Sequence, residues 1–486
     1  MSYSKFIAAG IILSMPFAAS AAEKVTFTKD VLPILQENCQ ICHRPEGANL
    51  GGMVAPMAFT TYQEVRPWAK AIAKAVSNRD MPPWDATAEF HGVFENERTI
   101  SQAAIDTIVA WAEQGAARGS LADAPEPLKF PDTDGWQIGE PDLVVSMPER
   151  YFVEDDVEDL YVTFQTDVTE EMLSEDRWLK AIEFRPGSSV VHHIISDGLG
   201  GIAPGNDPSV MREGFSSMMR AGTKVNWQMH YHKEPGPGTG VWDQSRVGLN
   251  FYPKDFQPEH QIHGNVMGKM DFRIPAGKAR HTETVSTTFK DDIMLLSYTP
   301  HMHLRGVAAK YTATYPDGSQ EVVLDVPQYD FNWQTSYKYA EPKILPKGTS
   351  LEVAMTWDNS PENETNPDPT QTVTFGQPTT DEMMFGFVSY AYVDEPETVV
   401  LSQEELAKYA GTYSIGGVQE FEVSQRGNVL IIGLGDREAE LEPISDTEFA
   451  GPFGMVITFT RNEAGLTESV SLKMGETQNF TAKRVQ

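Results

Sequence analysis

The stretch LLSYTPHMHLRG, from Leu295 to Gly306, is the part of the chain on which the predicted fold and site depend. We expect an extended strand here. Alternate side chains of a strand share a face, so His301 and His303 point the same way and Met302 points to the opposite face. Two imidazoles at this spacing can hold one metal ion, and a polar strand with two surface histidines is the alternative.

Imidazole and thioether groups recur elsewhere in the chain. Three more groups lie in segments with strand patterns: the pair His192 and His193, the His-x-His motif at His230 and His232, and the pair Met383 and Met384. Imidazole together with thioether suits a metal that cycles between copper(I) and copper(II), because the soft sulfur favours the reduced ion. We therefore expect copper.

Length and charge limit the classes of function. The chain has 486 residues and a net charge of -31. This length predicts about three domains, each with its own core. The negative charge argues against nucleic acid and anionic membrane surfaces as partners.

The first residues have the pattern of a secretory signal peptide. Residues 1–22 contain Lys5, an apolar run over 6–18 and small residues before Glu23, so we expect cleavage after Ala21 or Ala22. The apolar run is short for a membrane span. We expect an exported protein, periplasmic or secreted, with no membrane span after cleavage.

Residues 30–43, DVLPILQENCQICH, predict a helix that ends in Cys-x-x-Cys-His. Cysteines three residues apart lie on one helical face, so Cys39 and Cys42 can bond a single haem while His43 reaches its iron. A thioredoxin-type dithiol is the alternative, but that motif usually opens a helix, and it leaves His43 unexplained. We predict a covalent haem c.

The sixth iron ligand is predicted to be Met81. It lies in the segment DMPPW, whose two prolines end a preceding helix and stiffen the backbone. Met53, Met57 and His91 are rival ligands, and a methionine that only packs is a further alternative.

Three short helices are expected around this motif, over residues 30–43, 62–78 and 101–114. Together they resemble a small cytochrome c, which we assign to residues 23–123. A linker rich in proline and acidic residues follows at 124–142.

From Leu143 the pattern changes to short strands separated by turn signals such as Tyr315–Gly318. It predicts two tandem β-sandwich, jelly-roll-like domains at 143–260 and 261–397. Residues 398–486 resemble the small lipocalin-like β domain often appended to exported hydrolases. The expected fold is thus multidomain: a small all-α cytochrome c, two tandem β-sandwiches and a small C-terminal β domain.

Residues 143–393 resemble the copper type II, ascorbate-dependent monooxygenases, the family of peptidylglycine hydroxylating monooxygenase and dopamine β-hydroxylase. The resemblance rests on four short motifs that occur in the family's order: Val191-His192-His193, Gln228-Met229-His230-Tyr231, His301-Met302-His303-Leu304 and Asp381-Glu382-Met383.

The resemblance implies two copper ions. The first would be held by His192, His193 and His230, and the second by His301, His303 and Met383. In the family the second copper binds and activates oxygen, and the first stores an electron. His232 could replace His230, and Met384 could replace Met383. The remaining histidines match no motif, and we expect them in solvent-exposed loops: His260, His263 and His281.

Three positions depart from the peptide-amidating branch of the family, which there has Arg, Asn and Tyr to hold a peptide carboxylate. This chain has Thr299, Phe385 and Phe387 at those positions, and none of them pairs with a carboxylate. The family's disulfide-rich core is absent as well. We therefore expect a small neutral or apolar substrate.

The expected function is an exported copper monooxygenase that hydroxylates a C–H bond with O2. The fused haem would receive electrons from a periplasmic donor and pass them to the first copper. One alternative is a periplasmic c-type cytochrome whose β-sandwich domain binds copper for storage, delivery or sensing. Another is an exported binding module with vestigial metal motifs.

Overall fold

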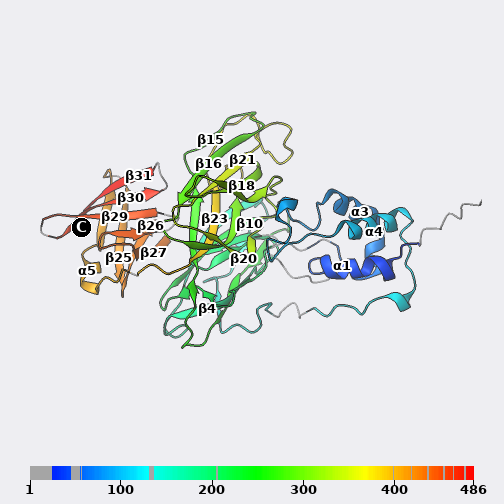
Figure 1. Cartoon of the computed structure of the whole chain (residues 1–486), viewed down its shortest axis with the longest axis horizontal. Helices are drawn as coiled ribbons and strands as arrows, with labels where there is room; N and C mark the ends of the chain where they lie inside the picture. The colour runs from blue at the N-terminus through cyan, green and yellow to red at the C-terminus, as the bar shows by residue number, and fades with distance from the viewer. Residues whose placement is uncertain are drawn as a thin grey trace, which may run out of the picture.

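The computed structural model describes residues 24–44, 55, 57–130, 136–196, 198–203, 206–397, 399–417, 419–434, 437–451, 455–463, 465–474 and 478–485. The predicted signal peptide and Met53 lie outside these residues. The described chain is rich in strands, with few helices. Helices occupy one end of the molecule, a large β region the middle, and a closed barrel the other end (Figure 1).

The N-terminal end holds most of the helices. Their bounds are η1 Phe27–Val31, α1 Leu32–Asn38, α2 Tyr62–Val65, η2 Arg66–Trp68, α3 Ala69–Asn78, η3 Ala88–Phe90, α4 Gln102–Glu113 and η4 Leu121–Asp123. A capping box of Thr61 and Glu64 begins α2, and the Ser101 side chain caps α4. The apolar faces of α1, α3 and α4 share one core that includes Leu35, Ile72 and Ile108.

The expected helix over 30–43 is shorter than predicted. It ends at Asn38, because Cys39 leaves the helical conformation and the Gln40 amide bonds back five residues to the Leu35 carbonyl. The Cys-x-x-Cys-His motif instead forms turns, in which the amides of Cys42 and His43 both bond to the Cys39 carbonyl.

The segment between α3 and α4 packs against the β region. Trp84, Phe90 and Phe94 are buried in the same core as Tyr337 and Tyr339. Phe94 and Tyr339 also form an antiparallel bridge. Part of the predicted cytochrome region therefore belongs to a β core.

Asp85 lies in this segment, and burial together with the charge of Asp330 raises the pKa of its carboxyl to about 7. Because the folded pKa lies above the ordinary value, ionisation destabilises the fold increasingly as pH rises from about 4 to 7. Asp85→Asn is expected to raise the free energy of unfolding by about 2–4 kcal/mol above pH 7 and to leave it nearly unchanged at pH 4. Urea unfolding of wild type and variant at pH 4 and pH 8 measures the difference in unfolding free energy at each pH. The same difference at both pH values would contradict this account.

The first β body has two main sheets. One has the order β1 (Leu143–Ser146), β12 (Arg246–Phe251), β4 (Arg177–Arg185), β7 (Ser209–Val210), with β9 (Met218–Met219) also on β4. The other has the order β3 (Asp159–Asp167), β10 (Lys224–His232), β5 (Val191–Ser196), β6 (Gly200–Ile202). Two short pairs flank them: β2 (Tyr151–Val153) with β11 (Val241–Asp243), and β8 (Phe215–Ser216) with β13 (His260–Gln261). Both sheets contribute to one core, through Leu179 and Leu249 from one and Ile194 and Trp227 from the other.

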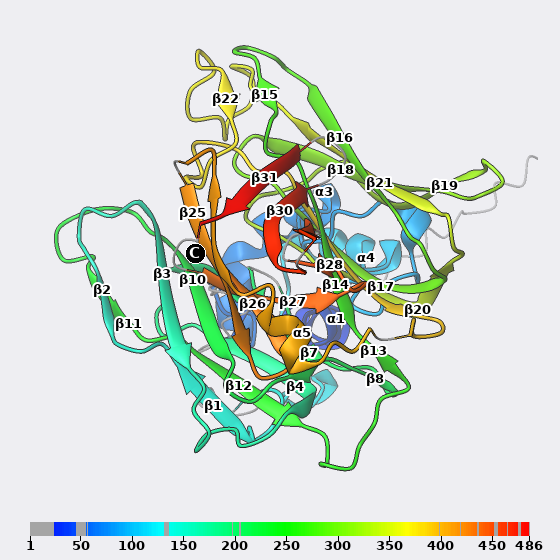
Figure 2. The same ribbon diagram turned by 90° about the vertical axis from the view of Figure 1, so that its left-hand side faces the viewer.

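The second β body repeats this plan. One sheet has the order β14 (His263–Gly268), β23 (Phe385–Tyr392), β17 (Ile293–His301), β20 (Tyr337–Leu345). The other has the order β16 (His281–Thr288), β21 (Ser350–Trp357), β18 (Gly306–Thr314), β19 (Gln320–Val326), and β15 (Arg273–Ile274) pairs with β22 (Val373–Thr374). The two sheets share a core that includes Leu295, Tyr311 and Val353. The two β bodies lie on opposite sides in the view along the molecule (Figure 2).

The C-terminal part is a short helix, α5 (Gln403–Ala407), and a closed barrel. Its strands are β24 Gly411–Ile415, β25 Gln419–Arg426, β26 Val429–Leu434, β27 Arg437–Pro443, β28 Glu448–Ala450, β29 Met455–Arg461, β30 Thr467–Met474 and β31 Gln478–Arg484. Ion pairs of Arg220 with Glu440 and of Lys224 with Glu438 join it to the first β body. Within the described residues, no helix combines the length and apolar character needed to cross a bilayer.

Candidate metal centre

His192, His193 and His230 form one group on neighbouring strands. In the pairing of β5 with β10, His193 stands opposite His230, while the next paired residues are Val191 and Tyr231. His192 is thus the extra residue of a β-bulge. Successive residues of a regular strand face opposite sides, and the bulge lets both histidines face His230.

The nitrogen spacing in this group suits a metal ion. The Nδ1 atom of His193 lies 3.3 Å from Nδ1 of His192 and 3.3 Å from Nδ1 of His230. Metal–nitrogen bonds of about 2.0–2.1 Å that meet at a tetrahedral angle place two nitrogens roughly 3.3 Å apart. All three ligand atoms lie within 4.8 Å of one another.

Burial keeps these imidazoles neutral, which is the form that binds metal. His193 and His230 are buried, and His192 is half-buried. Burial is the main cause that lowers the pKa of each ring, to about 3 for His192. The donor set thus needs no deprotonation at neutral pH.

Asp159 sets the tautomer of His230. Its Oδ1 lies 2.5 Å from Nε2 of His230, so Nε2 carries the proton and Nδ1 is left to face the other two rings. The rival His232 has a side chain that is 53% exposed, and it is not a member of the group found among the described residues. The geometry favours His230 over His232.

His301 and His303 form a second group in the other β body. His301 ends β17, whereas His303 lies beyond the strand in a turn that the Gly306 amide closes onto the His303 carbonyl. The expectation of a strand through His303 is therefore wrong, although the two rings still lie 5.4 Å apart, centroid to centroid. Met302 is buried in the core of the second β body.

Hydrogen bonds at Nδ1 leave the Nε2 atoms of this second group open. His301 Nδ1 lies 2.7 Å from Gln334 Oε1, and His303 Nδ1 lies 3.2 Å from the Asp381 carbonyl. Both partners are acceptors, so each Nδ1 carries the proton. The Nε2 atom of His303 is buried without a protein hydrogen-bond partner, as are the Nε2 atoms of His192 and His263.

Met383 follows the segment that holds His303. Asp381 accepts the ring hydrogen bond, and Glu382 accepts the His303 amide at 2.8 Å. Met384 belongs to the core of the second β body. Met383, which is 8% exposed, is accordingly the better candidate of the two for a metal ligand.

The two histidine groups meet where the β bodies touch. The rings of His193 and His301 lie 6.1 Å apart at nearly a right angle. Phe331 stacks on His192 at 4.9 Å and meets His303 edge-on at 6.1 Å. The structure thus gathers five histidines from both β bodies into one neighbourhood.

Glu382 organises the second group, and sequence patterns did not single out its role. Its carboxylate is 0% exposed and accepts hydrogen bonds from the amides of His303 and Arg305 and from Nε1 of Trp357. The one sequence feature that could have indicated this role is its position directly before Met383. No local sequence pattern marks Asp159 or Gln334 as part of the site.

The predicted haem ligands lie in the helical end. Cys39 and Cys42 are free thiols, and burial raises the pKa of Cys39 to about 12. His43 stacks on Phe59 at 4.2 Å, and its Nδ1 lies 3.1 Å from the Met57 carbonyl. That contact leaves Nε2 as the nitrogen available to iron.

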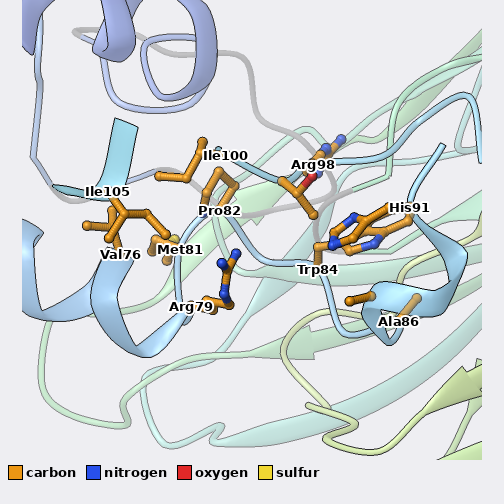
Figure 3. Close-up of a pocket in the computed structure, with 12 residues that line it drawn as sticks. Val76, Arg79, Met81, Pro82, Trp84, Ala86, His91, Arg98, Ile100 and Ile105 are labelled. Atoms are coloured by element: carbon orange, nitrogen blue, oxygen red, sulfur yellow. The ribbon is translucent and has the colours of Figure 1, made fainter. Parts of the chain in front are cut away.

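Met81 lines a cavity of about 170 Å³ (Figure 3). Its side chain lies beside Val76 and Ile105, and Arg79 and Arg98 line the same cavity. The charge of Arg98 also acts on the Cys42 thiol, so Arg98 lies near both the cavity and the cysteine motif. Of the rival ligands, Met57 contacts His43 through its backbone carbonyl. The Nδ1 atom of His91 lies 2.6 Å from Oε1 of Glu97.

His260, His263 and His281 are not the solvent-exposed loop residues that we expected. They lie in β13, β14 and β16, and all are half-buried. Each ring has a polar neighbour: the Tyr392 carbonyl for His260, the Glu395 carboxylate at 3.4 Å for His263, and Glu283 for His281. These histidines belong to no motif in the sequence, and the strands in which they lie were therefore not predicted.

No family model and no curated protein matches this chain. Among solved structures, the STIV MCP is similar with 6% identity and a TM-score of 0.20, covering 45% of this chain and 97% of that chain. The infectious bursal disease virus VP2 subviral particle is similar with 10% identity and a TM-score of 0.15, covering 53% of this chain and 82% of that chain. Likenesses at these scores carry no argument about fold or function.

Proposed function

We propose that this protein is an exported copper monooxygenase that hydroxylates a C–H bond of a small neutral or apolar molecule. In this proposal the two sheet pairs are tandem β-sandwiches and the helical end is a small cytochrome c. The observation that carries the proposal is the orientation of the histidines: three Nδ1 atoms converge in one group, and Nε2 is left open in the other.

The donor sets suit copper in two different roles. His192, His193 and His230 supply nitrogen alone, whereas His301, His303 and Met383 add a thioether, which favours copper(I). When bound, copper at the second group would activate O2 for hydroxylation, and copper at the first would pass single electrons to it. Asp159, Gln334 and the Asp381 carbonyl hold the tautomers of His230, His301 and His303, respectively.

Aromatic side chains beside His301 support an apolar substrate. The rings of Phe385 and Phe387 each lie 6.4 Å from the ring of His301. Thr299 is occupied by a hydrogen bond to Ser336. These positions give a substrate carboxylate no cation to pair with.

A covalent haem c is part of the proposal. The pKa of the Cys39 thiol is raised, the opposite of the lowered value that a redox dithiol needs. The helical end is also joined to the histidine region: the Asn96 side chain bonds to the Ser336 carbonyl, two residues after Gln334, the partner of His301. Haem there would supply single electrons to copper.

The test is reoxidation of the haem. The purified protein is reduced, mixed with O2 and followed by haem absorbance. We expect His193→Ala to slow reoxidation strongly, because it removes the ring in contact with both other ligands of the first group. His232→Ala, which removes an exposed neighbour outside the group, should leave the rate unchanged. Equal rates in wild type and His193→Ala would refute delivery through the first copper.

A further inference from the structure

Asp159 uses its two oxygens to contact both β bodies. Oδ1 lies 2.5 Å from His230 Nε2 in the first body. Oδ2 accepts a hydrogen bond from the Thr379 hydroxyl at 2.9 Å and a longer one from the Thr379 amide at 3.4 Å. Thr379 lies in the second body and is 5% exposed, whereas the Asp159 side chain is 23% exposed, so this contact is partly buried.

The Thr379 segment also orients the second histidine group. Two residues later the Asp381 carbonyl bonds to the ring of His303, and Glu382 bonds to the His303 amide. Met383 follows directly. One carboxylate is therefore connected to the ligands of both groups, through His230 on one side and through residues 379–383 on the other.

Another residue fixes the plane of the His230 ring but not its tautomer. Tyr161 stacks on this ring at 4.2 Å with an angle of 5°. Stacking leaves either ring nitrogen free to carry the proton, whereas an acceptor at Nε2 fixes the proton there. Asp159 supplies that acceptor.

We infer that Asp159 is a positioning residue that couples the two metal groups: it holds His230 for the first and, through Thr379, holds the segment that orients His303 and Met383. This inference rests on the proposed function, because it assumes copper at both groups. A carboxylate behind a metal-binding histidine fixes the ring and raises its basicity. Thr379 adds a contact that ties this effect to the other β body.

The test compares copper affinities of the full-length protein, measured by competition of copper(I) and copper(II) with a coloured chelator. Asp159→Asn is expected to weaken binding at the first group about 10–100-fold, the usual effect of losing such a partner. Thr379→Val, which touches no ligand, is expected to weaken it severalfold and to change the copper(II) EPR spectrum. Thr379→Ser keeps the hydroxyl and should behave as wild type.

The outcomes separate this inference from the proposed function. Failure of the wild type to bind copper overturns the proposed function. Wild-type binding that neither Asp159→Asn nor Thr379→Val alters overturns the inference and leaves the proposed function standing. Weakening by Asp159→Asn with no effect of Thr379→Val overturns the coupling between the two groups.

Discussion

Glu382→Ala is expected to lower the free energy of unfolding by about 3–5 kcal/mol, because it leaves three buried hydrogen-bond donors without an acceptor, at about 1–3 kcal/mol each. The substitution leaves the amides of His303 and Arg305 and the indole N–H of Trp357 without their acceptor. It also removes the carboxylate whose charge acts on the buried Arg305 guanidinium. Chemical denaturation, monitored by tryptophan fluorescence, measures the change.

Glu382→Gln is the matched control, because it keeps the shape and one acceptor oxygen. We expect Glu382→Gln to lower the free energy of unfolding by less than Glu382→Ala. The glutamine oxygen still accepts some of the hydrogen bonds, and only the donors that face its NH2 group lose their acceptor. Copper binding at the second group should fall in both variants, because Glu382 fixes the turn that carries His303. An alanine variant within about 1 kcal/mol of wild type would contradict this role, since each orphaned buried donor alone costs about that much.

His230→Ala is expected to reduce copper from two ions to one per chain. His230 is fully buried, and its Nδ1 lies 3.3 Å from Nδ1 of His193. The loss in affinity at the first group should exceed the 10–100-fold that follows loss of an outer partner, because a direct ligand disappears. Elemental analysis after gel filtration measures the ratio of copper to protein.

His232→Ala provides the comparison for this prediction. Its side chain is 53% exposed and lies 3.7 Å from Asp159 without joining the group. We expect this variant to keep both copper ions. Loss of copper in His232→Ala with full retention in His230→Ala would reverse the assignment of the ligand.

Much of the histidine site can be predicted from short motifs, because each group contains two histidines that lie close together in sequence. His301 with His303, and His192 with His193, are neighbours in sequence and need only local geometry to meet. The bulge that turns His192 toward His230 has no sequence signal in this chain. His303 leaves its strand because Glu382 and a turn hold it, which alternation alone does not reveal.

The side chains that hydrogen-bond to these histidines lie far from them in sequence. This separation explains why sequence patterns did not identify them. Asp159 and His230 are 71 residues apart, and Gln334 and His301 are 33 apart. Nothing in a local pattern joins such residues. The same holds for Trp84, Phe90 and Phe94, which pack in the core of the second β body although they lie far from it in sequence.

The metal content of the purified protein tests the central claim most directly. We predict one covalent haem and two copper ions per chain, with nitrogen-ligated copper(II) in the EPR spectrum of the oxidised protein. Haem iron without stoichiometric copper would contradict the monooxygenase proposal, because the five histidines would then gather for another purpose.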